Sequence, residues 1–227
     1  MLVSIHLPKT AGTTFGQLLQ KHLGHRLMMD YGDWVGWETS ESLDRRRIRV
    51  AEMRARSEEL SLCYDAIHGH FIADKYIDLF PSANFIAFVR DPYQQAVSNY
   101  EYILRNPLIN HPAVQYFHRE KLTLIDFIRW DMRRNPQSLF LGSIQVTDLT
   151  MVGITEQFSR SLALFNKIFD WQLTNDRIVN SNPIRQTESY NITSDIRAAV
   201  DESCETDLEL YRKSVEVFSQ LLKKWDA

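Results

Sequence analysis

The sequence predicts an α/β protein in which a central parallel sheet is flanked by helices. Short apolar segments with the character of buried strands alternate along the chain with amphipathic segments that have helical periodicity. The 227 residues, 44% of them hydrophobic, are enough for one α/β domain with a substantial core. No internal repeat, low-complexity segment or linker interrupts them, so we expect a single domain over residues 1–227.

Four segments are expected to form the strands. Residues 2–7 are an apolar run that ends at Pro8, and residues 83–90 are the most apolar stretch of all. Residues 62–70 and 148–154 are the other two strand candidates. Ligands of parallel sheets bind beyond the carboxyl ends of the strands, so residues that follow these segments are the first candidates for a site.

Helices are expected between and after these strands. Asp91 and Pro92 have the residue types of a helix N-cap and a first helical position. Thr206 and Glu209 have the spacing of a capping box. Residues 28–38 contain two glycines and three large aromatic side chains, and we expect a loop there. The predicted helices span residues 13–22, 41–60, 71–80, 92–104, 123–132, 159–169 and 208–225.

Composition narrows the class of protein. The net charge of −3 argues against a broad nucleic-acid-binding surface. Cys63 and Cys204 lie far apart and have no metal-ligand spacing, so we expect no disulfide framework, which favours a reducing compartment. No apolar run approaches the roughly 20 residues that span a bilayer. We therefore expect a soluble, cytoplasmic protein without a membrane span, unless a leader or an anchor has been removed.

The first candidate motif is HLPKTAGTTF, residues 6–15, which joins the first strand to the first helix. A helix N-terminus offers unpaired N–H groups and a partial positive charge, so it binds phosphate or sulfate. Gly12 permits close backbone approach and Lys9 adds a cation. The alternative is an ordinary turn with an incidental lysine. Hydroxyl donors come from Thr10, Thr13 and Thr14.

The spacing of this motif differs from that of the ATP-binding P-loop, GxxxxGK[ST], in which lysine directly follows the second glycine. Here Lys9 precedes Gly12, and no earlier glycine is present. No acidic strand end suited to a magnesium ion is evident. We therefore expect this segment to hold a phosphate without a metal.

The second motif, FVRDPYQQAVSNY, follows the third predicted strand. Arg90 ends that strand, and Ser98 lies about two turns into the next helix. An arginine fork and a serine hydroxyl suit a terminal phosphate. The alternative is that Arg90 pairs with a surface carboxylate.

The third motif is IHGH, in which His68 and His70 point to the same side of an extended strand. An imidazole, with an unperturbed pKa of about 6.5, suits a general base for an attacking hydroxyl. Two alternatives stay open. Each histidine can be structural, or the pair can bind zinc, although no third ligand has convincing spacing.

Together the three motifs resemble those of sulfotransferases that use 3′-phosphoadenosine 5′-phosphosulfate (PAPS). HLPKTAGTTF is similar to their 5′-phosphosulfate loop, especially in the heparan sulfate 2-O- and 6-O-sulfotransferases, and Arg-Asp-Pro with Ser98 is similar to their 3′-phosphate motif. His-Gly-His is similar to a motif of the 2-O enzymes. The resemblance covers roughly residues 1–23, 62–104, 148–170 and 180–214. It implies a P-loop-nucleotide-kinase-like sulfotransferase fold.

The resemblance also implies an activity, the transfer of a sulfonate group from PAPS to an acceptor hydroxyl, with a saccharide as the acceptor, adenosine 3′,5′-bisphosphate (PAP) as product and no metal. Lys9 would contact the bridging oxygen between sulfonate and phosphate. His70 would be the base, with His68 as its orienting partner or an alternative base. Nucleotide contacts are implied for Lys9, Thr10, Ala11, Gly12, Thr13, Thr14, Arg90, Ser98, Arg185 and Thr187.

Residues 24–60 and 105–147 are outside this resemblance, and we expect them to shape the acceptor site. Tyr31, Trp34 and Trp37 are candidates for stacking on a sugar ring or an aromatic acceptor, with loop packing as the alternative. The arginine-rich helix predicted over residues 41–60 also carries acidic residues, so we expect a solvated face and not a polysaccharide-binding one.

Two other functions stay open at this point. An atypical nucleotide kinase would require magnesium-dependent ATP binding, and the spacing of the first motif argues against it. A sulfotransferase-like module that binds a nucleotide or polysaccharide without catalysis would not need Lys9 or His70.

Overall fold

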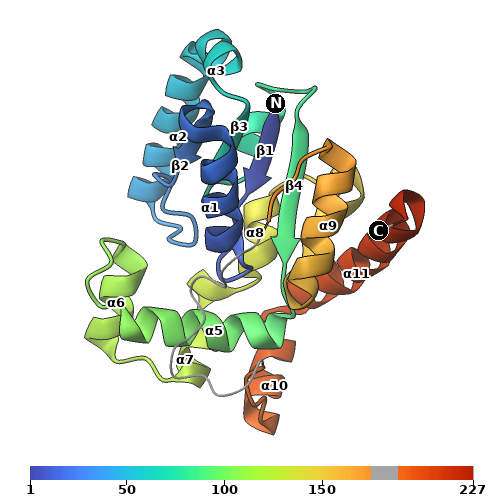
Figure 1. The fold of residues 1–227 in the computed structure, drawn as a ribbon. Helices are drawn as coiled ribbons and strands as arrows, with labels where there is room; N and C mark the ends of the chain where they lie inside the picture. Colours follow the sequence, from blue (N-terminus) through green and yellow to red (C-terminus); the bar gives the residue numbers. More distant parts are fainter. Residues whose placement is uncertain (175–188, 227) are drawn as a thin grey trace.

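A computed structural model describes residues 1–174 and 189–226 of the chain, and these form one five-stranded sheet (Figure 1). The strand order is β2-β3-β1-β4-β5, and every neighbouring pair is parallel. This arrangement confirms the predicted α/β class with a central parallel sheet. The strands are β1 (Leu2–Ile5), β2 (Leu27–Asp30), β3 (Ala66–Gly69), β4 (Asn84–Val89) and β5 (Met151–Ile154).

Helices cover both faces of the sheet. In Figure 1, α1 and α9 lie in front of it and α8 lies behind it, while α11 packs against the edge strand β5. The helices are α1 (Gly12–Leu23), α2 (Ser40–Ala55), α3 (Ser57–Cys63), α4 (Asp74–Ile77), α5 (Pro92–Arg105), α6 (Pro112–Glu120), α7 (Leu124–Arg129), α8 (Pro136–Leu141), α9 (Phe158–Phe169), α10 (Ser194–Ser203) and α11 (Glu205–Trp225). None of the helices in the described ranges has the length and apolar composition needed to cross a membrane.

The core forms because the sheet is buried on both sides. All four residues of β1, β3 and β5 are buried, as expected for parallel strands covered by helices. From α1, Phe15 and Leu19 reach this core at helical spacing, and Phe165 of α9 packs edge-on against Phe15. The predicted helices 13–22 and 159–169 are therefore confirmed to within two residues.

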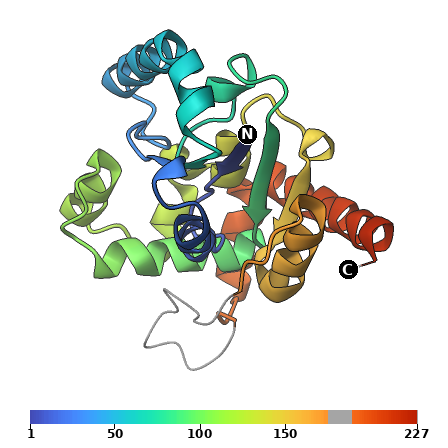
Figure 2. The same cartoon turned by 45° about the horizontal axis from the view of Figure 1, so that its top comes forward.

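Helix α5 sets the place of the site. It crosses beneath the carboxyl ends of β1 and β4 (Figures 1 and 2). Its start was predicted correctly, because the Asp91 carboxylate accepts hydrogen bonds from the backbone N–H groups of Tyr93 and Gln94, and Pro92 is the first helical residue. The Gln95 amide then donates to the Pro8 carbonyl at 3.0 Å, which ties α5 to the segment after β1.

The loop predicted over residues 28–38 is wrong at its start, because β2 occupies Leu27–Asp30. This short strand lies at one edge of the sheet, and its Met29 side chain is 48% exposed. Only Leu27 and Asp30 of β2 are buried, whereas β5 at the opposite edge is buried throughout, so β2 lacks the pattern of a buried strand.

Other predicted boundaries are also wrong. The helix expected over 41–60 is divided at Arg56, and α3 then occupies the start of the strand expected over 62–70. Only Asp74–Ile77 is α-helical within the segment 71–80, and the helix expected over 123–132 ends at Arg129. No side chain caps α11, so the capping box at Thr206 is wrong. Helices α6, α8 and α10 were not predicted.

Candidate functional site

A cavity of about 1050 Å³ opens at the carboxyl ends of the central strands. The segment between β1 and α1, helix α5 and residues 155–160 after β5 contribute most of its polar wall. Its lining residues within the described ranges carry one carboxylate, Glu156, although the whole chain has a net charge of −3. The cationic lining residues are Lys9, Arg90, Arg105, Arg133 and Arg160. An excess of cations concentrated in one cavity favours an anionic ligand.

The segment between β1 and α1 is a tight turn that places the start of a helix at the cavity. Lys9 and Ala11 both have left-handed backbone conformations, with φ values of 64° and 66°. Such values are uncommon and costly for residues with a Cβ atom. Ala11 is the N-cap of α1 and offers no capping side chain, so the helix begins beside the cavity without a competing acceptor.

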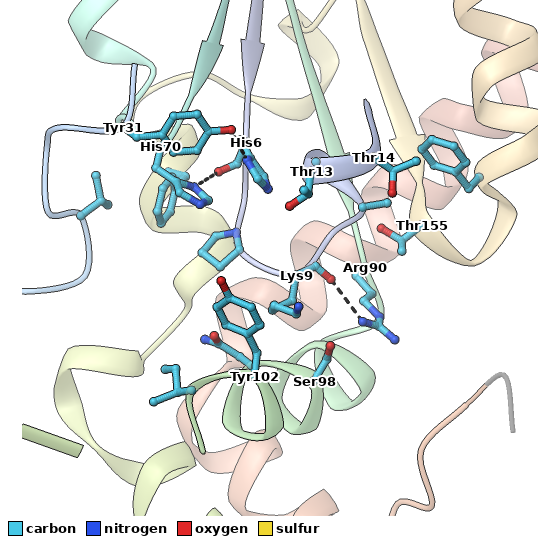
Figure 3. Close-up of a pocket in the computed structure, with 18 of the residues that line it drawn as sticks. His6, Lys9, Thr13, Thr14, Tyr31, His70, Arg90, Ser98, Tyr102 and Thr155 are labelled. Carbon is cyan, nitrogen blue, oxygen red and sulfur yellow. Dashed lines mark hydrogen bonds between the residues drawn. The ribbon is translucent and has the colours of Figure 1, made fainter. Parts of the chain in front are cut away.

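Lys9 extends into the cavity (Figure 3). Its Nζ atom lies 4.2 Å from the centre of the Tyr102 ring, a cation–π contact that holds the ammonium group above α5. Burial, together with the charges of Arg90 and Arg105, lowers the pKa of Lys9 to about 8. A bound anion would relieve this repulsion between cations.

Arg90 stands at the end of β4 and joins the second motif to the first. Its Nη1 atom donates to the Lys9 carbonyl at 3.2 Å, and its Nε atom lies 3.7 Å from a Glu156 carboxylate oxygen. The side-chain amide of Gln137 on α8 bonds to both the N–H and the carbonyl of Arg90, each at 2.9 Å. Figure 3 shows Ser98 projecting from α5 beside Arg90. These groups therefore face the cavity as one donor set.

Three histidines lie together on the other side of the turn. The rings of His6 and His70 are stacked with their centres 4.1 Å apart, and the ring of His68 lies 5.1 Å from that of His6. Burial and the neighbouring His70 and His68 lower the pKa of His6 well below its usual value. Burial lowers the pKa of His70 to about 4 and that of His68 to about 3. All three rings are therefore neutral at pH 7.

A hydrogen bond determines which nitrogen of His70 is free to accept a proton. His70 Nδ1 lies 2.5 Å from the His6 carbonyl oxygen, which is only an acceptor, so Nδ1 carries the hydrogen. In the neutral ring, Nε2 then holds the lone pair. Because His70 lines the cavity, that nitrogen is placed as a base would be.

The two histidines of the third motif have different environments. His68 is 1% exposed, is not among the lining residues, and bonds through Nδ1 to the Ser4 hydroxyl at 2.9 Å. The strand register explains this, because Ser4 of β1 pairs with His68 of β3. Only His70 reaches the cavity, one residue past the end of β3.

Gly12 is required by the His6 ring. A Cβ atom at this position would overlap that ring, which stacking against His70 holds in place. We expect Gly12→Ala to lower the free energy of unfolding by about 1–3 kcal/mol, as overpacking does. Thermal and urea unfolding measure this loss. The double variant Gly12→Ala/His6→Ala should lose less than the sum of the single variants, whereas strict additivity would contradict the proposed overlap.

Some of the other residues predicted for the site line the cavity and some do not. Ala11, Gly12, Thr13 and Thr14 line the cavity with Lys9. Thr10 is not among the lining residues, because its side chain is buried and its hydroxyl donates to the Leu7 carbonyl at 2.9 Å. Arg185 and Thr187 lie outside the described residues.

The three predicted acceptor residues also differ in position. Tyr31 and Trp34 line the cavity, and the Tyr31 hydroxyl bonds to His6 Nδ1 at 2.8 Å. Trp37 instead packs against Tyr116 and Trp130, which fits the alternative of loop packing.

A buried ionic cluster fixes the loop that carries Tyr31. Lys75 Nζ donates to Asp30 at 2.6 Å and to Asp33 at 2.8 Å, and all three residues are buried. Arg49 bonds to both carboxylates, at 2.7 and 2.9 Å. Since Asp30 and Asp33 flank Tyr31 in sequence, the cluster holds that phenol against His6. The arginine-rich α2 thus contributes Arg49 to a structural role.

Sequence reasoning missed several cavity residues. His6 could have been found, because pairing the apolar runs of β1 and β3 in parallel places it beside His70. Tyr102 lies one helical turn beyond Ser98 on the same helix, so its place beside the cavity could also have been predicted. Arg133 and His111 come from segments in which the sequence shows no recognisable motif.

No protein-family model matches the sequence, and no curated protein sequence matches it. Among solved structures, the chain is similar to a sulfotransferase from Alicyclobacillus acidocaldarius, with 13% identity, a TM-score of 0.48 and coverage of 99% of this chain and 98% of that one. It is also similar to mouse sulfotransferase SULT7A1 complexed with PAP, with 12% identity, a TM-score of 0.37 and coverage of 91% of this chain and 65% of that one. At these identities and TM-scores, the similarities carry no argument about function. The functional argument rests on the cavity.

Proposed function

We propose that this chain is a PAPS-dependent O-sulfotransferase. The observation that carries the proposal is the meeting of three motifs in one cavity: Lys9 after β1, Arg90 after β4 and His70 after β3. Each alone has an ordinary structural explanation. Their convergence supplies a phosphate-binding turn, a second anion site and a neutral base, which is the set that sulfonate transfer from a doubly phosphorylated nucleotide requires.

The residues present fit such a nucleotide. The start of α1, with Lys9, Thr13 and Thr14, would hold the 5′-phosphosulfate, and Arg90 with Ser98 would hold the 3′-phosphate. When bound, PAPS supplies a sulfonate group, which passes to the acceptor oxygen as the bond between sulfur and the 5′-phosphate oxygen breaks. PAP is then the product.

Lys9 would act where negative charge grows. Its ammonium group is placed between the histidine side of the cavity and the Arg90 side (Figure 3). There it can stabilise the charge that develops on the departing phosphate oxygen, together with the start of α1. The Tyr102 ring and the hydrogen bond from Arg90 to the Lys9 carbonyl fix the lysine in advance of the reaction.

His70 would take the proton of the attacking hydroxyl at Nε2. Its Nδ1 hydrogen is already committed to the His6 carbonyl, so the tautomer is set before an acceptor arrives. The lowered pKa keeps the ring neutral at physiological pH, and the proton that it accepts can leave to solvent after transfer.

The acceptor named by the sequence resemblance is a carbohydrate, and this stays a prediction, as does membership of the heparan sulfate 2-O and 6-O branch. Trp34, which lines the cavity under the guanidinium of Arg45 at 4.5 Å, is the side chain best placed to stack on a sugar or aromatic ring.

Incubation with radiolabelled PAPS and a panel of glycans, phenols and hydroxy acids tests the proposed activity. Label should move to at least one acceptor in the presence of EDTA. Nucleotide binding without transfer to any acceptor would favour the non-catalytic module. Magnesium-dependent ATP binding with no affinity for PAP would favour the kinase.

The lowered pKa of Lys9 predicts how nucleotide binding depends on pH. Since that pKa is about 8, affinity for PAP should fall as the pH rises through that value and the ammonium group loses its proton. At a pH equal to the pKa, binding should therefore take up as much as about half a proton per site. Calorimetry in buffers of different ionisation enthalpy measures this uptake. Equal uptake in Lys9→Met would contradict the assignment.

A further inference from the structure

Arg133 is a cavity cation that the proposed transfer does not use. It ends the single 3₁₀ turn Asp131–Arg133 after α7 and lines the cavity. Its Nε atom is buried and has no hydrogen-bond partner. Within residues 1–174 and 189–226, no carboxylate lies within 4.0 Å of its guanidinium group. A buried guanidinium without a counter-charge is costly unless a ligand supplies one.

Aromatic packing holds this guanidinium in position. Its central carbon lies 5.4 Å from the centre of the Phe127 ring and 5.7 Å from that of Trp130. Burial lowers the pKa of Arg133 to about 10, which still leaves the group charged at pH 7. A Cβ atom on Gly36 would lie 3.5 Å from Arg133 Nη1, so the loop after β2 closes over the other side. The guanidinium group is therefore held by contacts with both aromatic rings and with the loop after β2.

Arg133 is separate from the nucleotide side of the cavity. The cations that lower the pKa of Lys9 are Arg90 and Arg105. Arg133 acts instead on His111, whose pKa is lowered to about 4 by burial, then by Arg133 and then by His70. His111 thus lies within electrostatic reach of both Arg133 and the proposed base, on the acceptor side.

His111 adds a hydrogen-bond donor near this cation. Its Nδ1 atom accepts a hydrogen bond from the backbone N–H of Ala113 at 3.1 Å, which caps α6. In the neutral ring the hydrogen is then on Nε2. Because His111 lines the cavity, the guanidinium and an imidazole N–H are both available to one anionic group.

More of the cavity wall is apolar than polar. Hydroxyl groups of a sugar chain buried against such a wall would lose water without gaining partners, whereas a hydrocarbon or aromatic body would gain by burial. The apolar lining residues of the cavity include Trp34, Val35, Ile103, Ile109, Val114 and Phe140.

We propose that the acceptor is a small hydroxyl compound with an apolar body and an anionic group, and that Arg133 binds the anionic group. The inference rests on the proposed sulfotransferase function for the role of the hydroxyl, but the anion site is a property of the cavity itself. A carboxylate has the geometry for two parallel hydrogen bonds from a guanidinium group, and so do a sulfate and a phosphate.

Matched acid and ester pairs test this proposal. The probes are para-hydroxyphenylpropionate and a panel of hydroxyaryl and hydroxyalkyl carboxylic acids, each with its methyl ester, plus a uronic acid disaccharide. Binding is measured by calorimetry with and without PAP. At least one acid should bind about tenfold or more tightly than its ester, because only the acid can form a charged hydrogen-bonded pair with the guanidinium group.

Three variants assign the preference to Arg133. Arg133→Met should remove the preference for the acid, and Arg133→Lys should restore part of it. Arg134→Met is the matched control, because Arg134 is exposed, pairs with Asp131 at 2.9 Å and does not line the cavity. Circular dichroism and PAP affinity show whether each variant is folded.

Several outcomes would overturn the inference: equal binding of acids and esters, an unchanged preference in Arg133→Met, binding of the disaccharide alone, or binding of no probe. Failure of the proposed function is a different result. In that case PAP would not bind, while a preference for acids that depends on Arg133 would persist in the nucleotide-free protein.

Discussion

Replacement of Lys9 by alanine is expected to lower kcat for sulfonate transfer by about 30- to 1000-fold, equivalent to 2–4 kcal/mol of transition-state stabilisation. The reason is geometric. Lys9 is held at the strained turn before α1, above Tyr102, where the leaving phosphate oxygen would develop charge. The measurement is initial-rate transfer from PAPS to the best acceptor found in the panel.

Lys213→Ala is the matched control for this prediction. Lys213 lies on the surface of α11 and pairs with Glu209 at 3.3 Å, so its loss should leave the rate unchanged. Circular dichroism should show both variants folded. Turnover by Lys9→Ala at the wild-type rate would contradict the role of the lysine.

Replacement of His70 by asparagine is the second change with a large expected effect. The asparagine amide can still donate to the His6 carbonyl but has no basic nitrogen in place of Nε2. Removal of a general base typically costs about 10²- to 10⁴-fold, so kcat should fall within that range. PAP affinity should stay close to wild type, because the phosphate donors come from other residues.

His68→Asn distinguishes the two histidines of the third motif. His68 does not reach the cavity, and its hydrogen bond to Ser4 is buried. We expect this variant to lose stability while its folded fraction keeps transferring sulfonate. Loss of transfer in folded His68→Asn, combined with near-normal transfer in His70→Asn, would exchange the two roles.

The fold was predictable where local physics determines it. Four of the five strands were found from short segments between predicted helices, and the N-cap at Asp91 was read correctly from residue type alone. The edge strand β2 was missed because partial exposure removes its pattern. The break at Arg56 and the short helix α4 depend on packing between distant segments, which a local pattern does not contain.

The site was predictable where each motif follows a strand. Parallel pairing necessarily brings Lys9, His70 and Arg90 to one edge of the sheet, so their proximity followed from the strand order. The positions of the residues that support the motifs could not be predicted in this way. Gln137 forms hydrogen bonds with the Arg90 backbone but lies far from it in sequence. Asp207 accepts hydrogen bonds from the backbone N–H groups of Gln137 and Ser138 and is also distant in sequence. Only the tertiary structure places them.

The same reason explains why the acceptor side was the least predictable. Arg133 and His111 enter the cavity from two segments without a recognisable motif, and the lysine of the buried cluster, Lys75, lies on a four-residue helix. Long-range ion pairs and unpaired cations have no periodic signature.

Calorimetric titration of PAP in the absence of metal tests the central claim most directly, with adenosine 5′-monophosphate as the comparison and Arg90→Met as the variant. The protein should bind PAP about tenfold or more tightly than the monophosphate, a difference of at least 1.4 kcal/mol, and Arg90→Met should remove that difference. Equal affinity for the two nucleotides, or no binding of either, would contradict the assignment of the strand ends to a single doubly phosphorylated nucleotide.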